Sequence, residues 1–140
     1  MALTPTEKFS SWYPWESRGS FPGDHYRGVY VIAASEPELP VLEIPEAIIY
    51  IGETHGASRS LKKRLYNFNK SGSRGKRGHA GGVTYFGKGL DPEFNDIFFS
   101  VLPCDLTDQA VNTAWIFFKE RELIWKYADK HGRLPACNSE

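Results

Sequence analysis

The sequence has few cysteines and no long apolar run, and each shortage narrows what the protein can be. Its two cysteines, Cys104 and Cys137, are too far apart to act as the closely spaced ligands of a zinc site, so we expect free thiols. No stretch of about eighteen consecutive apolar residues is present, which excludes a membrane-spanning helix. The first residues do not resemble an export signal, and we therefore predict a cytoplasmic protein without a membrane partner.

Net charge is also absent, because seventeen lysines and arginines balance seventeen acids. The two signs are segregated, however, since residues 54–90 contain no Asp or Glu but nine basic residues. A basic block on a neutral chain predicts a binding site for a polyanion such as nucleic acid, and the alternative is a solvated charged surface. The block contains no P-loop pattern, which excludes a nucleotide cradle of that type.

The chain as a whole predicts one globular domain over residues 1–140, because 41% of its residues are hydrophobic and 14% aromatic. Residues 29–33 and 47–51 are rich in β-branched and aromatic residues and predict two neighbouring antiparallel strands joined by a loop. Residues 97–102 predict a third strand, ended by Pro103. The expected fold class is α/β (α+β), with a small, mainly antiparallel central β-sheet of about three strands flanked by helices. Residues 1–27 predict an aromatic-rich arm over the core, with a helical turn near residues 7–11.

A helix is expected over residues 58–69, because Leu61, Leu65 and Phe68 form an apolar stripe. Arg64 lies at the border of this stripe, where it either reaches out to water or holds its guanidinium over a cleft that suits a phosphate. Residues 70–82 predict a glycine-rich basic loop without a single shape of its own. Its His79 is either incidental or an acid–base group. The residues expected to contact a sugar-phosphate backbone are Lys62, Lys63, Arg74, Lys76 and Arg77.

The last predicted helix is capped by Thr107 and runs to about Lys130 before Gly132 ends it. A helical wheel places Lys119, with most of the other charged residues, on the wet face of this helix. Glu120 lies on the opposite side, and its apolar neighbours there are Ile116, Phe117, Leu123, Ile124 and Tyr127. A carboxylate in such surroundings needs compensation. It is either the partner of a core arginine or a ligand of a hard metal ion.

Two tyrosines complete the pattern, and each has an aliphatic setting in one of the first two predicted strands. Both either help the sheet to pack or form part of a site. Together with the residues above they resemble the GIY-YIG nuclease superfamily. The resemblance covers about residues 28–138 and is carried by five segments in the family's order: Gly28-Val29-Tyr30, Tyr50-Ile51-Gly52, Arg64 within Ser60–Leu65, Glu120 followed by Leu123-Ile124, and Pro135-Ala136-Cys137-Asn138.

The resemblance implies a divalent-metal-dependent endonuclease that hydrolyses DNA phosphodiester bonds. It implies that Glu120 holds Mg²⁺ (or Mn²⁺), and that Arg64 stabilises charge on the phosphate. Tyr30, with Tyr50 beside it, is the first choice for orienting or deprotonating the attacking water. Asn138 would hydrogen-bond within the site or fix the C-terminal segment against it.

One departure from the family concerns Phe68, because members often have a His or Tyr four residues after the arginine. His79 is then the candidate to take over acid–base work. The expected catalytic residues are Tyr30, Tyr50, Arg64, His79, Glu120 and Asn138.

The implied partner is DNA, double-stranded or branched, bound by a monomer or a dimer. Two other hypotheses stay open: a nucleic-acid-binding module on the same fold that does not cut, and a small structural or interaction protein whose motifs are coincidental.

Overall fold

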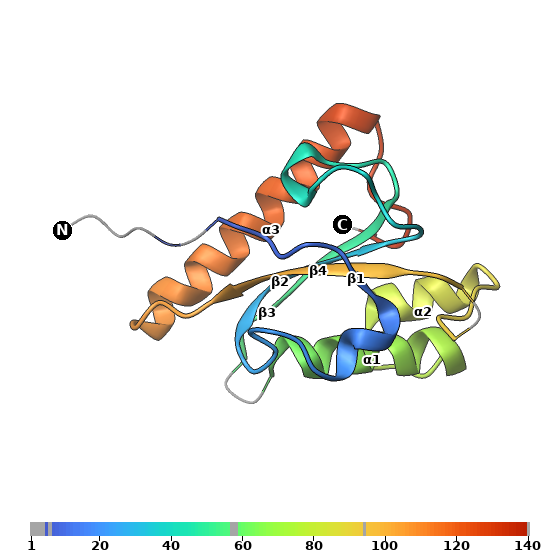
Figure 1. Ribbon diagram of the computed structural model, residues 1–140, viewed down its shortest axis with the longest axis horizontal. Helices are drawn as coiled ribbons and strands as arrows, with labels where there is room; N and C mark the ends of the chain where they lie inside the picture. The colour runs from blue at the N-terminus through green and yellow to red at the C-terminus, as the bar shows by residue number, and fades with distance from the viewer. Residues whose placement is uncertain (1–4, 6, 57–58, 94, 140) are drawn as a thin grey trace.

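The computed structural model describes residues 5, 7–56, 59–93 and 95–139. It contains a four-stranded antiparallel sheet in the order β1-β4-β2-β3 (Figure 1). The strands are β1 Tyr13–Pro14, β2 Arg27–Ala33, β3 Ile48–Thr54 and β4 Phe98–Cys104. The α-helices are α1 Leu61–Arg74, α2 Ala80–Gly87 and α3 Gln109–His131, and the 3₁₀ helices are η1 Trp15–Gly19 and η2 Val41–Glu43. The predicted fold class is confirmed.

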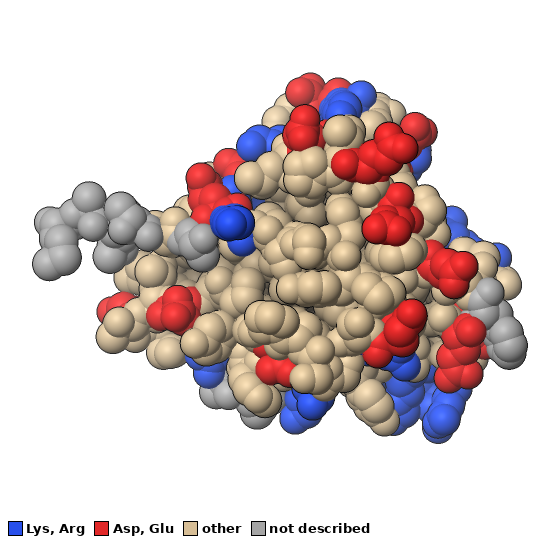
Figure 2. Space-filling view, in the orientation of Figure 1, with Lys and Arg blue, Asp and Glu red and all other residues tan. Residues whose placement is uncertain are grey.

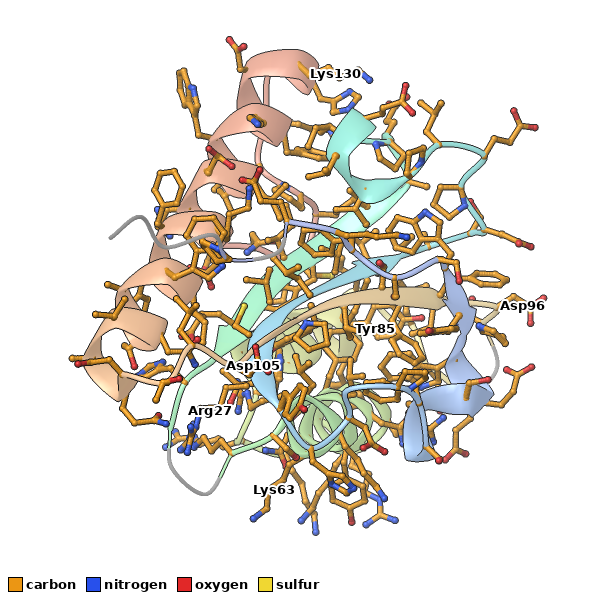
Figure 3. All side chains as sticks on the ribbon, turned by 60° about the vertical axis from the view of Figure 1, so that its left-hand side comes forward. Arg27, Lys63, Tyr85, Asp96, Asp105 and Lys130 are labelled. Carbon is orange, nitrogen blue, oxygen red and sulfur yellow. The ribbon has the colours of Figure 1, made fainter. Side chains whose placement is uncertain are left out.

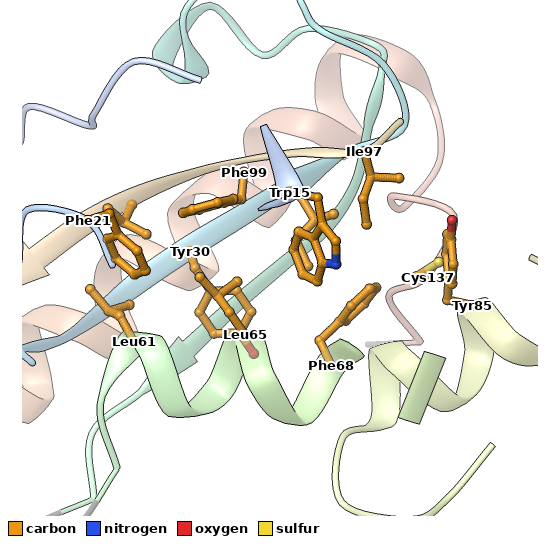
Figure 4. Packing of buried hydrophobic residues seen from close by; sticks show 12 residues of the cluster. Trp15, Phe21, Tyr30, Leu61, Leu65, Phe68, Tyr85, Ile97, Phe99 and Cys137 are labelled. Carbon is orange, nitrogen blue, oxygen red and sulfur yellow. The ribbon is translucent and has the colours of Figure 1, made fainter. Parts of the chain in front are cut away.

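Helices cover both faces of the sheet. Figure 1 shows α3 on one side and α1 with α2 on the other. Side chains alternate along a strand, so β2 contributes to two cores. Tyr30 and Ile32 belong to the cluster on the α1 side, which Figure 4 shows in close-up. Val29 and Val31 belong to the cluster on the α3 side. Both sides of β2 are therefore buried, and β3 forms the edge of the sheet beyond it.

The predicted antiparallel pairing of the first two long strands is confirmed, with Val31 opposite Ile51. The third predicted strand, β4, lies at the centre of the sheet between β1 and β2. Pro103 lies within β4 and does not end it, which corrects the prediction. Proline is tolerated here because β1 pairs only with Phe98 and Phe99 and does not reach Pro103. On the β2 side Pro103 opposes Gly28, where a side chain would collide with the β4 backbone.

The N-terminal arm packs on the sheet but not as a helical turn at residues 7–11, and that prediction is wrong. These residues have no helical structure, and the backbone N–H of Ser10 donates to the carbonyl of Val101 at 2.9 Å. The arm then forms β1 and η1. Trp15 and Phe21 are buried in the core, as expected of an aromatic arm that covers it.

The glycine-rich segment 70–82 does not form the expected loop. The predicted helix start, Ser58, lies outside the described residues, and α1 begins at Leu61 with Ser60 as its cap. It continues to Arg74, and α2 begins soon after, at Ala80. A Cβ added at Gly82 would lie 2.7 Å from Cβ of Ser71. The glycine thus lets α2 pack closely against α1, and this packing outweighs its low helix propensity.

In α3 the predicted end at Gly132 is confirmed, but the cap is Asp108 and not Thr107. Lys119 does not lie on a wet face, which corrects the helical-wheel assignment. Its side chain is 2% exposed, and its Nζ donates to Glu7 at 2.9 Å and to Glu122 at 2.7 Å. Glu7 belongs to the N-terminal arm, so packing of the arm on α3 buries the lysine. None of the helices in the described residues has the length and apolarity to span a membrane.

Candidate functional site

The two tyrosines of the predicted site lie on the same face of the sheet. In the β2–β3 register Tyr30 opposes Gly52 and Ile32 opposes Tyr50, so the two phenols occupy diagonal positions. Their ring centroids are 6.0 Å apart. A Cβ added at Gly52 would lie 2.5 Å from the Tyr50 ring and 2.7 Å from the Tyr30 hydroxyl. The glycine therefore makes room for both rings at once.

Tyr30 is fully buried, and its hydroxyl is the centre of a hydrogen-bonded cluster. The phenol oxygen lies 2.6 Å from Nε2 of His79. Nδ1 of His79 accepts from the backbone N–H of Gly82 at 3.2 Å, so the proton of the neutral ring is on Nε2 and points at Tyr30. The Arg64 side chain also bonds to Tyr30, and Tyr30 bonds to Tyr50. Figure 4 shows the Tyr30 ring reaching from β2 towards α1.

Burial decides the protonation of this cluster. It raises the pKa of Tyr30 well above its ordinary value of 10.0, with Tyr50 adding to the effect and Arg64 opposing it. It also raises the pKa of Tyr50, where Arg64 opposes and Glu120 adds to the effect. Burial and the nearby Arg64 lower the pKa of His79 to about 3. Both phenols thus keep their protons at neutral pH, and the imidazole is uncharged.

Arg64 is half-buried at the border of the α1 stripe, at the place where the sequence put it. Its Nη1 donates to the carbonyl of Gly78 at 3.2 Å. This bond ties α1 to the segment before α2 and keeps the guanidinium beside the phenols. A guanidinium has five donors, so part of its hydrogen-bonding capacity is available to a ligand.

Glu120 is half-buried on α3 and lines a cavity of about 240 Å³ together with Tyr50, Glu53 and Asn138. The cavity lies beside β3, the edge strand, where Tyr50 comes from the α1 side and Glu120 from the α3 side. The predicted apolar neighbours of Glu120 are buried except Phe117, which is 40% exposed.

The oxygen donors of the Glu120 cavity suit a hard cation. In the described part of the chain no group of three or more His, Cys, Asp or Glu residues could hold a metal ion. Mg²⁺ is usually bound by one or two carboxylates and several waters, so Glu120 and Glu53 fit this ion without a third protein ligand.

The side-chain amide of Asn138 is hydrogen-bonded to β3. Its Oδ1 accepts from the backbone N–H of Ile51, and its Nδ2 donates to the carbonyl of the same residue, both at 2.9 Å. The neighbouring Cys137 N–H donates to Ile49 at 2.7 Å. Asn138 was expected either to hydrogen-bond within the site or to fix the C-terminal segment against it. Its hydrogen bonds in the structure correspond to the second role.

The five basic residues expected to contact nucleic acid are all exposed, and none of them lines the cavity that contains Tyr50 and Glu120. In Figure 2 lysine and arginine side chains gather along the lower edge, on the side of α1, and Lys63 points away from the body of the molecule in Figure 3. Their positions are α1 and the turn that follows it: Lys62, Lys63, Arg74, Lys76 and Arg77.

Sequence reasoning missed Glu53 and His55. Glu53 directly follows Gly52 and has its side chain 16% exposed, and His55 Nδ1 lies 2.7 Å from its carboxylate. The signal was available, because Glu53 alternates with Gly52 and so lies on the Ile51 side of β3, the side of α3 and Glu120.

Comparison with known proteins adds no relative. No protein-family model, no curated protein and no solved structure matches this chain. Any assignment of function consequently depends on the residues and geometry described above.

Proposed function

We propose that this protein is a divalent-metal-dependent endonuclease of the GIY-YIG type that hydrolyses DNA phosphodiester bonds. The observation that carries the proposal is the convergence of Tyr30, Tyr50, Arg64 and His79, from two strands, α1 and the cap of α2, beside a cavity lined by Glu120. The Tyr50 phenol and two carboxylates line this cavity, and the Arg64 guanidinium lies next to it through its hydrogen bond to Tyr30. Together these groups suit a phosphate, an attacking water and a hard cation.

Each residue has a chemical role in this proposal. Arg64 binds the phosphate oxygens, on which negative charge builds up during in-line attack. Tyr50 orients the attacking water, because it lines the cavity while Tyr30 is fully buried. Tyr30 and His79 hold Tyr50 and Arg64 in place through their hydrogen bonds. The phenols keep their protons at neutral pH, so they position the water and do not act as its base.

Mg²⁺ or Mn²⁺ would be held by Glu120, with Glu53 as a second carboxylate in the same cavity. When bound, it would supply charge stabilisation at the leaving oxygen. The five exposed basic residues of α1 and the following turn would contact the DNA backbone further from the cut. We also propose that the enzyme works in the cytoplasm; its cysteines are both free thiols.

A nicking assay tests the proposal. Supercoiled plasmid is incubated with the protein in Mg²⁺ or in EDTA, and wild type is compared with Glu120→Gln. The matched control is Asp129→Asn, an exposed acid on the same helix. We expect Mg²⁺-dependent nicking by wild type and the control, and a loss of at least about 100-fold in Glu120→Gln. Absence of metal-dependent nicking over plasmid, branched and single-stranded substrates would overturn the nuclease assignment.

A second candidate function is a nucleic-acid-binding module that does not cut. The observation that favours it is the bonding of His79, whose two ring nitrogens are both engaged inside the protein. Such an imidazole does not exchange protons with a bound substrate, and Phe68 supplies no alternative acid or base. Retained gel-shift binding by a wild-type protein that shows no nicking would establish this second function.

A further inference from the structure

A second cavity lies next to the Glu120 cavity and shares Glu53 with it. It has a volume of about 390 Å³ and is lined by Glu53, Thr54, His55, Gly56, Arg59 and Arg64. We name it the Arg59 cavity. We propose that the Arg59 cavity binds the backbone phosphate adjacent to the one that is cut, so that the protein recognises two successive phosphates of one DNA strand. This inference rests on the proposed function and adds a subsite to it.

The two cavities differ in charge. The Glu120 cavity contains two carboxylates, Glu53 and Glu120, and one arginine, Arg121. The Arg59 cavity contains two guanidinium groups and one carboxylate. A cation therefore favours the first cavity, and an anion with several oxygen acceptors favours the second.

The carboxylate in the Arg59 cavity is engaged by a neighbour. Glu53 accepts a hydrogen bond from Nδ1 of His55 at 2.7 Å. The His55 ring also packs against Phe117 of α3, with centroids 4.6 Å apart. These contacts hold the His55 imidazole and the Glu53 carboxylate together in one part of the cavity lining. Arg59 and Arg64 form its basic part.

The described ends of the 54–59 segment are braced by hydrogen bonds. The Thr54 hydroxyl donates to the carbonyl of Arg59 at 3.4 Å, and the N–H of Arg59 donates to the carbonyl of Gly56 at 3.0 Å. Nε of Arg27 donates to the same carbonyl at 2.9 Å. The backbone that carries Arg59 is thus positioned by the body of the fold, which makes the cavity a built feature.

The two cavities are adjacent, as neighbouring phosphates of one nucleic-acid strand are. Two cavities with a common wall residue, Glu53, are close enough for neighbouring phosphates. Arg64 bonds to Tyr30 and also lines the Arg59 cavity, so it connects the two subsites.

Short oligonucleotides test the second subsite. The probes are d(TpT), with one phosphate, and d(TpTpT), with two, titrated into ¹⁵N-labelled protein and followed by NMR. We expect d(TpTpT) to bind more tightly than d(TpT), and to shift the amides of Thr54, Gly56 and Arg59 as well as those around Tyr50. In Arg59→Ala the advantage of d(TpTpT) should fall about five- to tenfold, because d(TpT), which can occupy either cavity, should lose less affinity than d(TpTpT).

Two further variants make the result specific. Arg133→Ala removes the same charge from an exposed side chain at the far end of α3 and should leave both affinities unchanged. Arg59→Lys keeps the charge but loses the planar fork, and should give an intermediate advantage. The inference is wrong if neither probe binds, or if Arg59→Ala leaves the advantage of d(TpTpT) intact. Mg²⁺-dependent nicking that needs Glu120 would in that case leave the nuclease proposal standing on its own.

Discussion

The phenol oxygen of Tyr30 lies 2.6 Å from Nε2 of His79, and both side chains are buried. The bond joins β2 to the cap of α2, and the Gly82 N–H on the other ring nitrogen fixes which atom carries the proton. A loop histidine has thereby become part of the core.

Burial and the nearby Arg64 make His79 a source of acid sensitivity. Its pKa is about 3 in the folded chain and 6.5 in its ordinary state, so the unfolded chain takes up the proton first. The stability it provides is complete above pH 6.5 and is lost as the pH falls towards 3, at up to about 1.4 kcal/mol per pH unit. In His79→Asn, where asparagine can still cap α2, this part of the slope should disappear.

Urea unfolding at pH 4 to 7 measures that slope. His25→Asn is the matched control, because the side chain of His25 is 86% exposed, and it should keep the wild-type slope. Parallel slopes in wild type and His79→Asn would contradict the assignment of a neutral, buried His79.

The space at Gly52 predicts a steric effect on the phenols. Gly52→Ala places a Cβ about where the Tyr30 and Tyr50 rings are now, and the rings must move apart. We expect a loss of about 1–3 kcal/mol in the free energy of unfolding, together with loss of nicking. Gly87→Ala, where nothing lies within 4 Å of the new Cβ, should change neither. Wild-type nicking by Gly52→Ala would show that the ring positions are not needed.

The Asn138 amide predicts a local effect at the sheet edge. Asn138→Ala removes both partners of the Ile51 backbone, and we expect a loss of about 1–3 kcal/mol. Hydrogen exchange should become faster at the amide of Ile51, which donates to the Asn138 side chain, and at that of Cys137, which donates to the carbonyl of Ile49. Ser139→Ala, one residue away and exposed, should leave both amides protected. Unchanged exchange in Asn138→Ala would mean that the segment is held by other contacts.

The buried ion pair of Lys119 predicts a difference between two lysines on one helix. Lys119 and Lys126 both pair with Glu122, at 2.7 Å and 3.7 Å, but only Lys119 is buried. Lys119→Ala should lower the free energy of unfolding by about 1–3 kcal/mol, since it leaves Glu122 and Glu7 without their common partner. Lys126→Ala should cost less than about 1 kcal/mol. Denaturant titrations of the two variants decide this, and equal losses would contradict it.

The strands and the phenols were predictable because their signals are local. Runs of β-branched residues gave β2, β3 and β4, and alternation gave the faces of Tyr30 and Tyr50. The diagonal meeting of the two rings was not predictable, because it depends on the register that sets Tyr30 opposite Gly52. That register depends on the geometry of the long loop between the strands, which carries no periodic signal.

The helices show where local signals fail. The glycines of α2 disfavour a helix, and only tertiary contacts explain two of them, since a side chain at Gly81 would meet the Tyr50 ring and one at Gly82 would meet α1. Lys119 looks like a solvent residue on a helical wheel, and its burial depends on Glu7, which is 112 residues away in the sequence. Strand alternation could have placed Glu53 on the side of α3, but the sequence does not reveal that Glu53 and His55 line one cavity with Arg59 and Arg64.

The space at Gly52 also has a consequence for how this sequence can diverge. Position 52 is constrained by side chains at positions 30 and 50, so the three positions can change only in a certain order. A larger residue at 52 becomes tolerable after one of the two rings has become smaller, and it is harmful before that. In a set of diverging descendants, the two tyrosines and the glycine would therefore be inherited as one unit, although they come from two separate stretches of the chain.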